Sequence, residues 1–104
     1  MKKREGFQDF VLDQLGALGD IDGRRMFGSY GLYHRGLFFA ILSKGRLYFK
    51  VHEDTRKEYV DSGMKPFRPT KKLTLKSYYE VPHEILENRE RLAEWARKAI
   101  RRVR

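Results

Sequence analysis

The stretch that decides the fold runs from Arg24 to Val51 and reads RRMFGSYGLYHRGLFFAILSKGRLYFKV. Its apolar and aromatic residues form three runs, which are Met26 to Tyr33, Leu37 to Leu42, and Leu47 to Val51. Short glycine-containing joins separate the runs and indicate hairpins, because a parallel crossover needs about a dozen residues or more. The stretch therefore predicts an antiparallel meander of three strands whose middle strand is apolar on both faces.

Two glycines, Gly28 and Gly31, interrupt the first of these strands. A phosphate-binding loop needs its glycines to lead into a helix, so that backbone N–H groups and the helix dipole meet the phosphate. These glycines lead into a strand instead. They predict a β-bulge rather than a phosphate site.

On the N-terminal side, apolar residues recur at the spacing of one helix face. They are Phe7, Phe10, Val11, Leu15 and Leu18. Gly19 is expected near the end of this helix, and the GDIDG segment that it begins is expected to be a loop.

On the C-terminal side, the pattern predicts a helix, two strands and a final helix. The helix is expected from Glu53 or Asp54 through Ser62, with Tyr59 and Val60 buried. An edge strand follows at Pro66–Pro69, then a strand from Leu73 to Val81 that places Tyr78 on its polar side. Asn88 is expected to cap the final helix, whose apolar stripe comprises Leu92, Trp95, Ala96, Ala99, Ile100 and Val103.

These elements predict an α+β fold in a single domain spanning residues 1–104. The expected architecture is a two-layer α/β domain in the order α-β-β-β-α-β-β-α, with helices packed on a five-stranded antiparallel sheet. The second face of the central strand is expected to comprise Phe38, Ala40 and Leu42. That face should be covered by the first helix or used in a homodimer.

Composition narrows the class of protein. The chain has no cysteine, which excludes disulfides and thiolate chemistry, and no apolar run approaches the roughly 18 residues of a membrane-spanning helix. A cytoplasmic protein without membrane contact is expected. The net charge is +9, with +2 in residues 1–5, +5 in residues 88–104 and only +2 in the 82 residues between them. Most of the excess positive charge is therefore terminal.

The sequence shows no constellation typical of catalysis. His34, His52 and His83 are isolated from one another and from carboxylates at metal-binding spacing, so neither a metal nor another cofactor is expected. The acidic residues between Glu53 and Asp61 are typical of a solvated helix face. We expect no enzymatic activity, although a small-molecule site beside His52 or Glu53 is the alternative that a pocket there would support.

Basic residues interleaved with aromatic ones are the main functional pattern. Phosphate contacts and base stacking would use such residues, so they form a candidate surface for nucleic acid or for a partner. The candidates are Arg24, Arg25, Lys50, Lys71, Lys72 and Lys76, beside Tyr48 and Tyr78, together with Lys98, Arg101 and Arg102 in the last helix. The alternative is that these side chains only solvate the sheet and complement the dipole of the final helix.

Several motifs resemble the N-terminal domain of the TfoX/Sxy family, in register from about Arg24 to Ala99. They are Arg25–Tyr33 (RMFGSYGLY), Leu37–Ala40 (LFFA), Gly45–Val51 (GRLYFKV), Thr55–Arg56, Pro66–Phe67, Ser77–Pro82 (SYYEVP) and Leu92–Ala96 (LAEWA).

The resemblance implies a two-layer domain with a five-stranded antiparallel sheet and no enzymatic activity. Members of the family include bacterial regulators of competence for DNA uptake, thought to act with the cyclic-AMP receptor protein at promoters. The resemblance therefore implies a regulatory domain whose partners are a transcription regulator of that kind and DNA. The full regulators carry a second, helical domain, so a stand-alone first domain is expected here. Sequence-independent binding of nucleic acid by a small basic protein is the alternative function.

Overall fold

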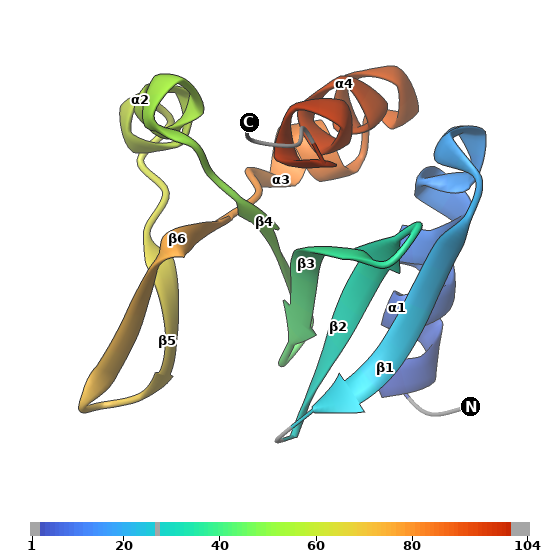
Figure 1. Ribbon diagram of the computed structural model, residues 1–104, viewed down its shortest axis with the longest axis horizontal. Helices are drawn as coiled ribbons and strands as arrows, with labels where there is room; N and C mark the ends of the chain where they lie inside the picture. The colour runs from blue at the N-terminus through green and yellow to red at the C-terminus, as the bar shows by residue number, and fades with distance from the viewer. Residues whose placement is uncertain (1–2, 27, 101–104) are drawn as a thin grey trace.

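The computed structural model describes residues 3–26 and 28–100, and it shows helices packed on one face of an antiparallel sheet (Figure 1). The sheet has six strands in the spatial order β1-β2-β3-β4-β6-β5. The elements are α1 (Lys3–Gln14), a 3-10 turn η1 (Gly16–Leu18), β1 (Ile21–Met26), β2 (Ser29–His34), β3 (Leu37–Ser43), β4 (Arg46–Lys50), α2 (Glu53–Asp61), β5 (Pro66–Thr70), β6 (Leu73–Glu80), α3 (His83–Leu86) and α4 (Arg89–Ile100).

The α+β class and the antiparallel meander are confirmed, but the prediction of five strands is wrong. The missing strand is β1, which begins at Ile21 inside the segment expected to be a loop. It is an edge strand that pairs with β2 from Ile21–His34 to Met26–Ser29. An edge strand with one neighbour need not be apolar on alternate residues, so hydrophobic periodicity does not reveal it.

The extra strand also changes the role of the first glycine. Gly28 lies in the turn between β1 and β2 with φ of 80°, a conformation that glycine adopts without strain. The irregularity in the sheet lies further on, where Leu32 pairs with Ala40 but Tyr33 pairs with Phe38, leaving Phe39 as an extra residue in β3. The prediction of a bulge at Gly28 and Gly31 is therefore wrong: Gly28 forms a turn, Gly31 pairs regularly with Arg24 and Ile41, and the bulge of the sheet lies at Phe39 of β3.

The main core lies between the sheet and all the helices. Val11 and Leu15 of α1 are fully buried, as are Phe39 and Phe49 of the sheet and Leu92 of α4. The predicted stripe of α4 is confirmed for the described residues, and Val103 lies outside them.

Two predicted core residues are wrong. Phe10 is 40% exposed and Val60 is 52% exposed, because each lies on the outer side of its helix.

The second face of the sheet has a composition different from the predicted one. Ala40 and Leu42 belong to the main core, whereas Phe38 and Ile41 belong to a second apolar cluster on the opposite face. The extra residue Phe39 explains the difference, because a one-residue insertion exchanges the faces of the residues on its two sides. The described helices leave this second face uncovered (Figure 1).

The β5–β6 hairpin is joined to the rest of the sheet by a short seam. Three residue pairs, Tyr48–Glu80, Phe49–Tyr79 and Lys50–Tyr78, link β4 to β6, and backbone hydrogen bonds from Val51 N–H to the Ser77 carbonyl and from Val81 N–H to the Leu47 carbonyl flank them. The remainder of the hairpin extends away from the helices, at the lower left of Figure 1. This hairpin, with the uncovered face beside it, is the most distinctive part of the surface.

Candidate nucleic-acid interface

The uncovered face of the sheet holds a cluster of aromatic side chains at the base of the hairpin. We call it the aromatic cluster, and it comprises Tyr33, Phe38, Ile41, Tyr48, Phe67, Leu75 and Tyr78. The ring centroid of Phe38 lies 5.1 Å from that of Tyr33 and 5.3 Å from that of Tyr78. The ring centroids of Tyr48 and Phe67 are 4.7 Å apart. These distances are typical of favourable ring pairs, so the cluster ties the hairpin to the centre of the sheet.

Burial changes the acid–base properties of two tyrosines in this cluster. It raises the pKa of Tyr78 to about 12, with the nearby hydroxyl of Tyr33 adding to the effect. Burial also raises the pKa of Tyr48, as does the Glu80 carboxylate, while Arg46 acts in the opposite direction. Tyr48 and Tyr78 therefore keep their phenolic protons to a higher pH than an ordinary tyrosine does.

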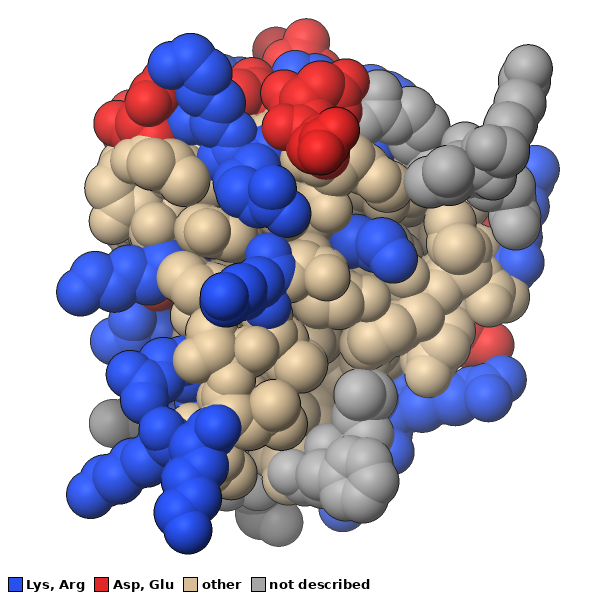
Figure 2. Space-filling view, turned by 60° about the vertical axis from the view of Figure 1, so that its left-hand side comes forward, with Lys and Arg blue, Asp and Glu red and all other residues tan. Residues whose placement is uncertain are grey.

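The hairpin itself is strongly basic. Between Asp61 and Glu80 the chain has no acidic residue and carries five basic ones. We call this set the basic hairpin, and it comprises Lys65, Arg68, Lys71, Lys72 and Lys76. All five are exposed, and none forms a salt bridge with another described residue. Figure 2 shows lysine and arginine side chains along the left border of this side of the molecule, beside an uncharged surface.

The tip of the hairpin is held in place by its own hydrogen bonds. The Arg68 guanidinium donates to the Lys71 carbonyl oxygen through Nη2 at 2.7 Å, and the Lys72 N–H donates to Thr70 Oγ1 at 3.3 Å. Every residue from Arg68 to Leu73 is exposed. The tip therefore presents a fixed turn to solvent rather than to the protein core.

The predicted basic residues that the structure describes lie in three places, which are the hairpin, the edge strand β1 and the helical side of the sheet. Lys71 and Lys72 lie in the turn of the hairpin and Lys76 lies on its strand β6. Arg24 lies on β1, where its guanidinium carbon is 5.1 Å from the centre of the Tyr33 ring. Arg25 is the next residue along β1, and successive residues of a strand face opposite sides of the sheet.

Lys50 and Lys98 belong to the helical side. They line a depression too small to admit a water molecule, and Lys98 Nζ forms an ion pair with the Glu58 carboxylate of α2 at 3.2 Å. The last two predicted residues, Arg101 and Arg102, lie outside the described residues. Lys98 is thus engaged within the protein and does not join the hairpin.

The prediction for the two tyrosines is also corrected. Tyr78 is 8% exposed and Tyr48 is half-buried, so neither stands free on a polar face. Irregular pairing between β5 and β6 places Leu75 in the same cluster as Tyr78, although the residues are an odd number of positions apart.

Two site residues were missed from the sequence, Lys65 and Arg68. Averaging the charge over the 82 central residues hid them, because the acidic residues of that segment lie elsewhere, several of them on α2. A charge count over residues 62–79 alone would have found the whole basic hairpin.

The remaining candidates for chemistry are scattered in the described residues. His83 Nε2 lies 3.0 Å from the Glu87 carboxylate, whereas His52 Nε2 is shielded from solvent without a hydrogen-bond partner. No group of three His, Asp or Glu side chains suited to a metal ion occurs within residues 3–26 and 28–100. Across those same residues, no helix is both long and apolar enough to cross a membrane.

Comparison with known proteins places the chain in a family. A search of curated proteins found none that matches it. The sequence profile of the TfoX N-terminal domain, however, matches residues 13–103, nearly the whole chain. This confirms the resemblance drawn from the motifs of the meander. The protein belongs to the TfoX N-terminal domain family.

Proposed function

We propose that this protein is a non-enzymatic regulatory domain, related to the control of competence and transcription, that acts in contact with DNA through its basic hairpin. Family membership supports a regulatory role of this kind. The observation that carries the DNA contact is the set of five exposed basic side chains that no described carboxylate neutralises.

The physical reason lies in counterion release. Each lysine or arginine that neutralises a DNA phosphate frees a condensed cation, and this entropy gain provides most of non-specific affinity. A side chain already engaged in an ion pair, such as Lys98, must first give up that pair. The five side chains of the basic hairpin have no such cost and lie on one projecting element.

A protein partner has a separate surface available. Acidic side chains gather at the upper end of the molecule in Figure 2. Four of the acidic residues lie on α2, where Glu58 and Asp61 pair with Lys98 and Lys57 and where Glu53 and Asp54 begin the helix. DNA bound at the hairpin would leave this end facing away. We propose that a transcription regulator resembling the cyclic-AMP receptor protein contacts the helical side.

The test is binding of a fluorescent 30-base-pair duplex, followed by anisotropy between 50 and 300 mM salt. The logarithm of the affinity should fall linearly with the logarithm of salt concentration, at about −0.9 for each phosphate contacted. The double variant Lys71→Ala with Lys72→Ala should make that slope shallower by about 1.8, which corresponds to the loss of two phosphate contacts.

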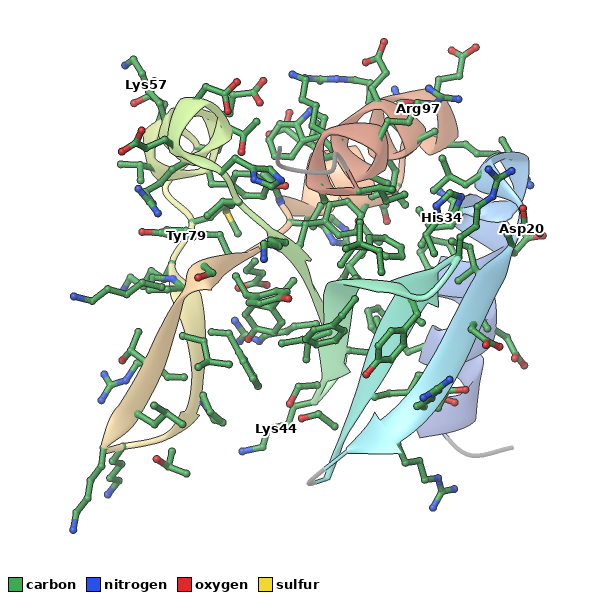
Figure 3. The ribbon with its side chains drawn as sticks, viewed as in Figure 1. Asp20, His34, Lys44, Lys57, Tyr79 and Arg97 are labelled. Carbon is green, nitrogen blue, oxygen red and sulfur yellow. The ribbon has the colours of Figure 1, made fainter. Side chains whose placement is uncertain are left out.

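The matched control removes the same charge from α2 and α4, as Lys57→Ala with Arg97→Ala (Figure 3), and should leave the slope unchanged. A second control deletes residues 1–4 and 101–104, so that terminal charge is separated from hairpin charge. Equal losses for the hairpin and helix variants would show that only net charge matters. Absence of salt-dependent binding in the intact protein would overturn DNA contact and leave the protein partner as the route of action.

A further inference from the structure

The hairpin has the dimensions of an arm that enters a DNA groove. Beyond the seam with β4, the segment Leu73–Lys76 of β6 pairs only with β5 among the described residues. Four extended residues span roughly 13 Å. A ribbon of two strands fits the major groove of B-DNA, about 12 Å wide, as it stands, and it enters the minor groove, about 6 Å wide, only where the duplex is bent so that this groove opens.

The tip carries apolar side chains where a purely electrostatic contact would need none. Leu73 is 48% exposed, and Pro69 is also exposed, on opposite sides of the two lysines of the turn. Proteins that bind the minor groove often insert leucine or proline between base steps and kink the duplex by about 20–90°. A half-exposed leucine that directly follows two lysines has the chemistry of such a wedge.

The arm is also anchored well enough to transmit force to DNA. At its base, Phe67 of β5 lies against Tyr48 of β4, with ring centroids 4.7 Å apart, and Phe67 is only 6% exposed. At its tip, the hydrogen bond from Arg68 to the Lys71 carbonyl holds the turn. A wedge must keep its shape while the base steps separate, because unstacking costs a few kcal/mol per step.

We infer that the β5–β6 hairpin enters the minor groove of duplex DNA as a two-stranded arm, with Leu73 as the wedge that bends it. This inference rests on the proposed function, since it specifies how the same hairpin holds DNA. The lysines and Arg68 contact the phosphates on both sides of the groove, and Leu73 provides the apolar contact. Binding then depends on how easily a sequence is deformed rather than on its base edges.

The experiment measures DNA bending by energy transfer between dyes at the two ends of the 30-base-pair duplex. Intact protein should increase the transfer, and netropsin, which occupies the minor groove, should compete with it. Leu73→Ser should lose most of the increase in transfer while its affinity at low salt falls less than about fivefold. Val60→Ser is the matched control, because Val60 is a similarly exposed apolar residue on α2.

The outcomes separate the two proposals. Hairpin-dependent binding without bending, or competition by methyl green in the major groove but not by netropsin, would overturn the arm and leave DNA contact standing. Equal bending by Leu73→Ser and the intact protein would exclude the wedge, provided that circular dichroism shows the variant folded. Tighter binding of duplex RNA than of duplex DNA would also overturn the inference, because the A-form minor groove is wide and shallow. Absence of any salt-dependent binding would instead remove the proposed function itself.

Discussion

At the scale of single residues, the contact between Gly23 and Tyr30 shows how one position restricts its neighbour. The Tyr30 ring lies across Gly23 of the adjoining strand, and a Cβ at position 23 would come closer than 3.0 Å to that ring. The ring packs against the main core, so displacing it costs buried contacts. Tyr30 thus fills the space that glycine leaves on the edge strand β1.

We predict that Gly23→Ala destabilises the protein by about 1 kcal/mol, measured as the free energy of unfolding in urea. The loss of stability should come from the overlap of the new Cβ with the Tyr30 ring, and not from an effect of alanine on the backbone of β1. In a Tyr30→Ser background, the same change should be neutral or slightly stabilising, because alanine lowers the entropy of the unfolded chain. An equal cost in both backgrounds would show that the ring is not responsible.

Tyr78 gives a second prediction at this scale. Its pKa is raised to about 12, so the folded state holds the phenolic proton more tightly than the unfolded chain, where tyrosine titrates near 10. The stabilising contribution is complete below about pH 10 and is lost as the pH rises toward 12. Tyr78→Phe should therefore lose stability less steeply than the intact protein over this range, as followed by urea unfolding at several pH values. Identical slopes would contradict the burial of the Tyr78 hydroxyl in the folded state.

At the scale of the elements, the sequence predicts what periodicity and turn chemistry determine. Apolar runs and glycines located the three strands from β2 to β4, and proline placed β5 at an edge. β1 could not be found this way, since Ile21, Asp22 and Gly23 show no regular alternation and are ordered by pairing with β2. The faces of β3 depended on Phe39, whose insertion is a property of two strands together.

The cap of α4 provides a prediction for an element. The Arg91 N–H donates to Asn88 Oδ1 at 3.1 Å, which confirms the predicted N-cap. Asn88→Ala should lower the free energy of unfolding by about 1 kcal/mol, because an N–H of the first turn loses its partner. Asn88→Ser keeps an oxygen at the cap and should change stability by only a few tenths of a kcal/mol. Both values can be measured in urea, and an equal loss for the two variants would argue against the cap.

At the scale of the whole molecule, contacts between distant parts of the chain decide which basic side chains are paired with a carboxylate and which are not. Lys98 was predicted in the same candidate surface as the hairpin lysines, yet it pairs with Glu58, 40 residues away. No local pattern reveals such a pair. Lys71 and Lys72 were found from the sequence because a turn exposes its residues wherever it lies, whereas Lys65 and Arg68 required the charge to be counted over the hairpin alone.

Because Lys98 is paired with Glu58, we predict that it contributes to the stability of the protein and not to the binding of DNA. Lys98→Ala should leave the affinity for duplex DNA within about twofold of the intact protein. Its stability should fall by less than about 1 kcal/mol, because the pair is partly exposed. The anisotropy titration and a urea curve on the same sample give both values. A loss of affinity equal to that of Lys71→Ala would place Lys98 in the interface after all.

The three residue pairs that join β4 to β6 divide the sheet into parts with different opening energies. Amide protons of β2 and β3, paired on both sides, should exchange with solvent slowly, whereas those in the outer half of β5 and β6 should exchange early. Local opening of this kind leaves the helical core intact. The hydrogen bonds of the outer hairpin therefore open separately from those of the central strands, while the packing of Phe67 against Tyr48 keeps the base of the hairpin in place.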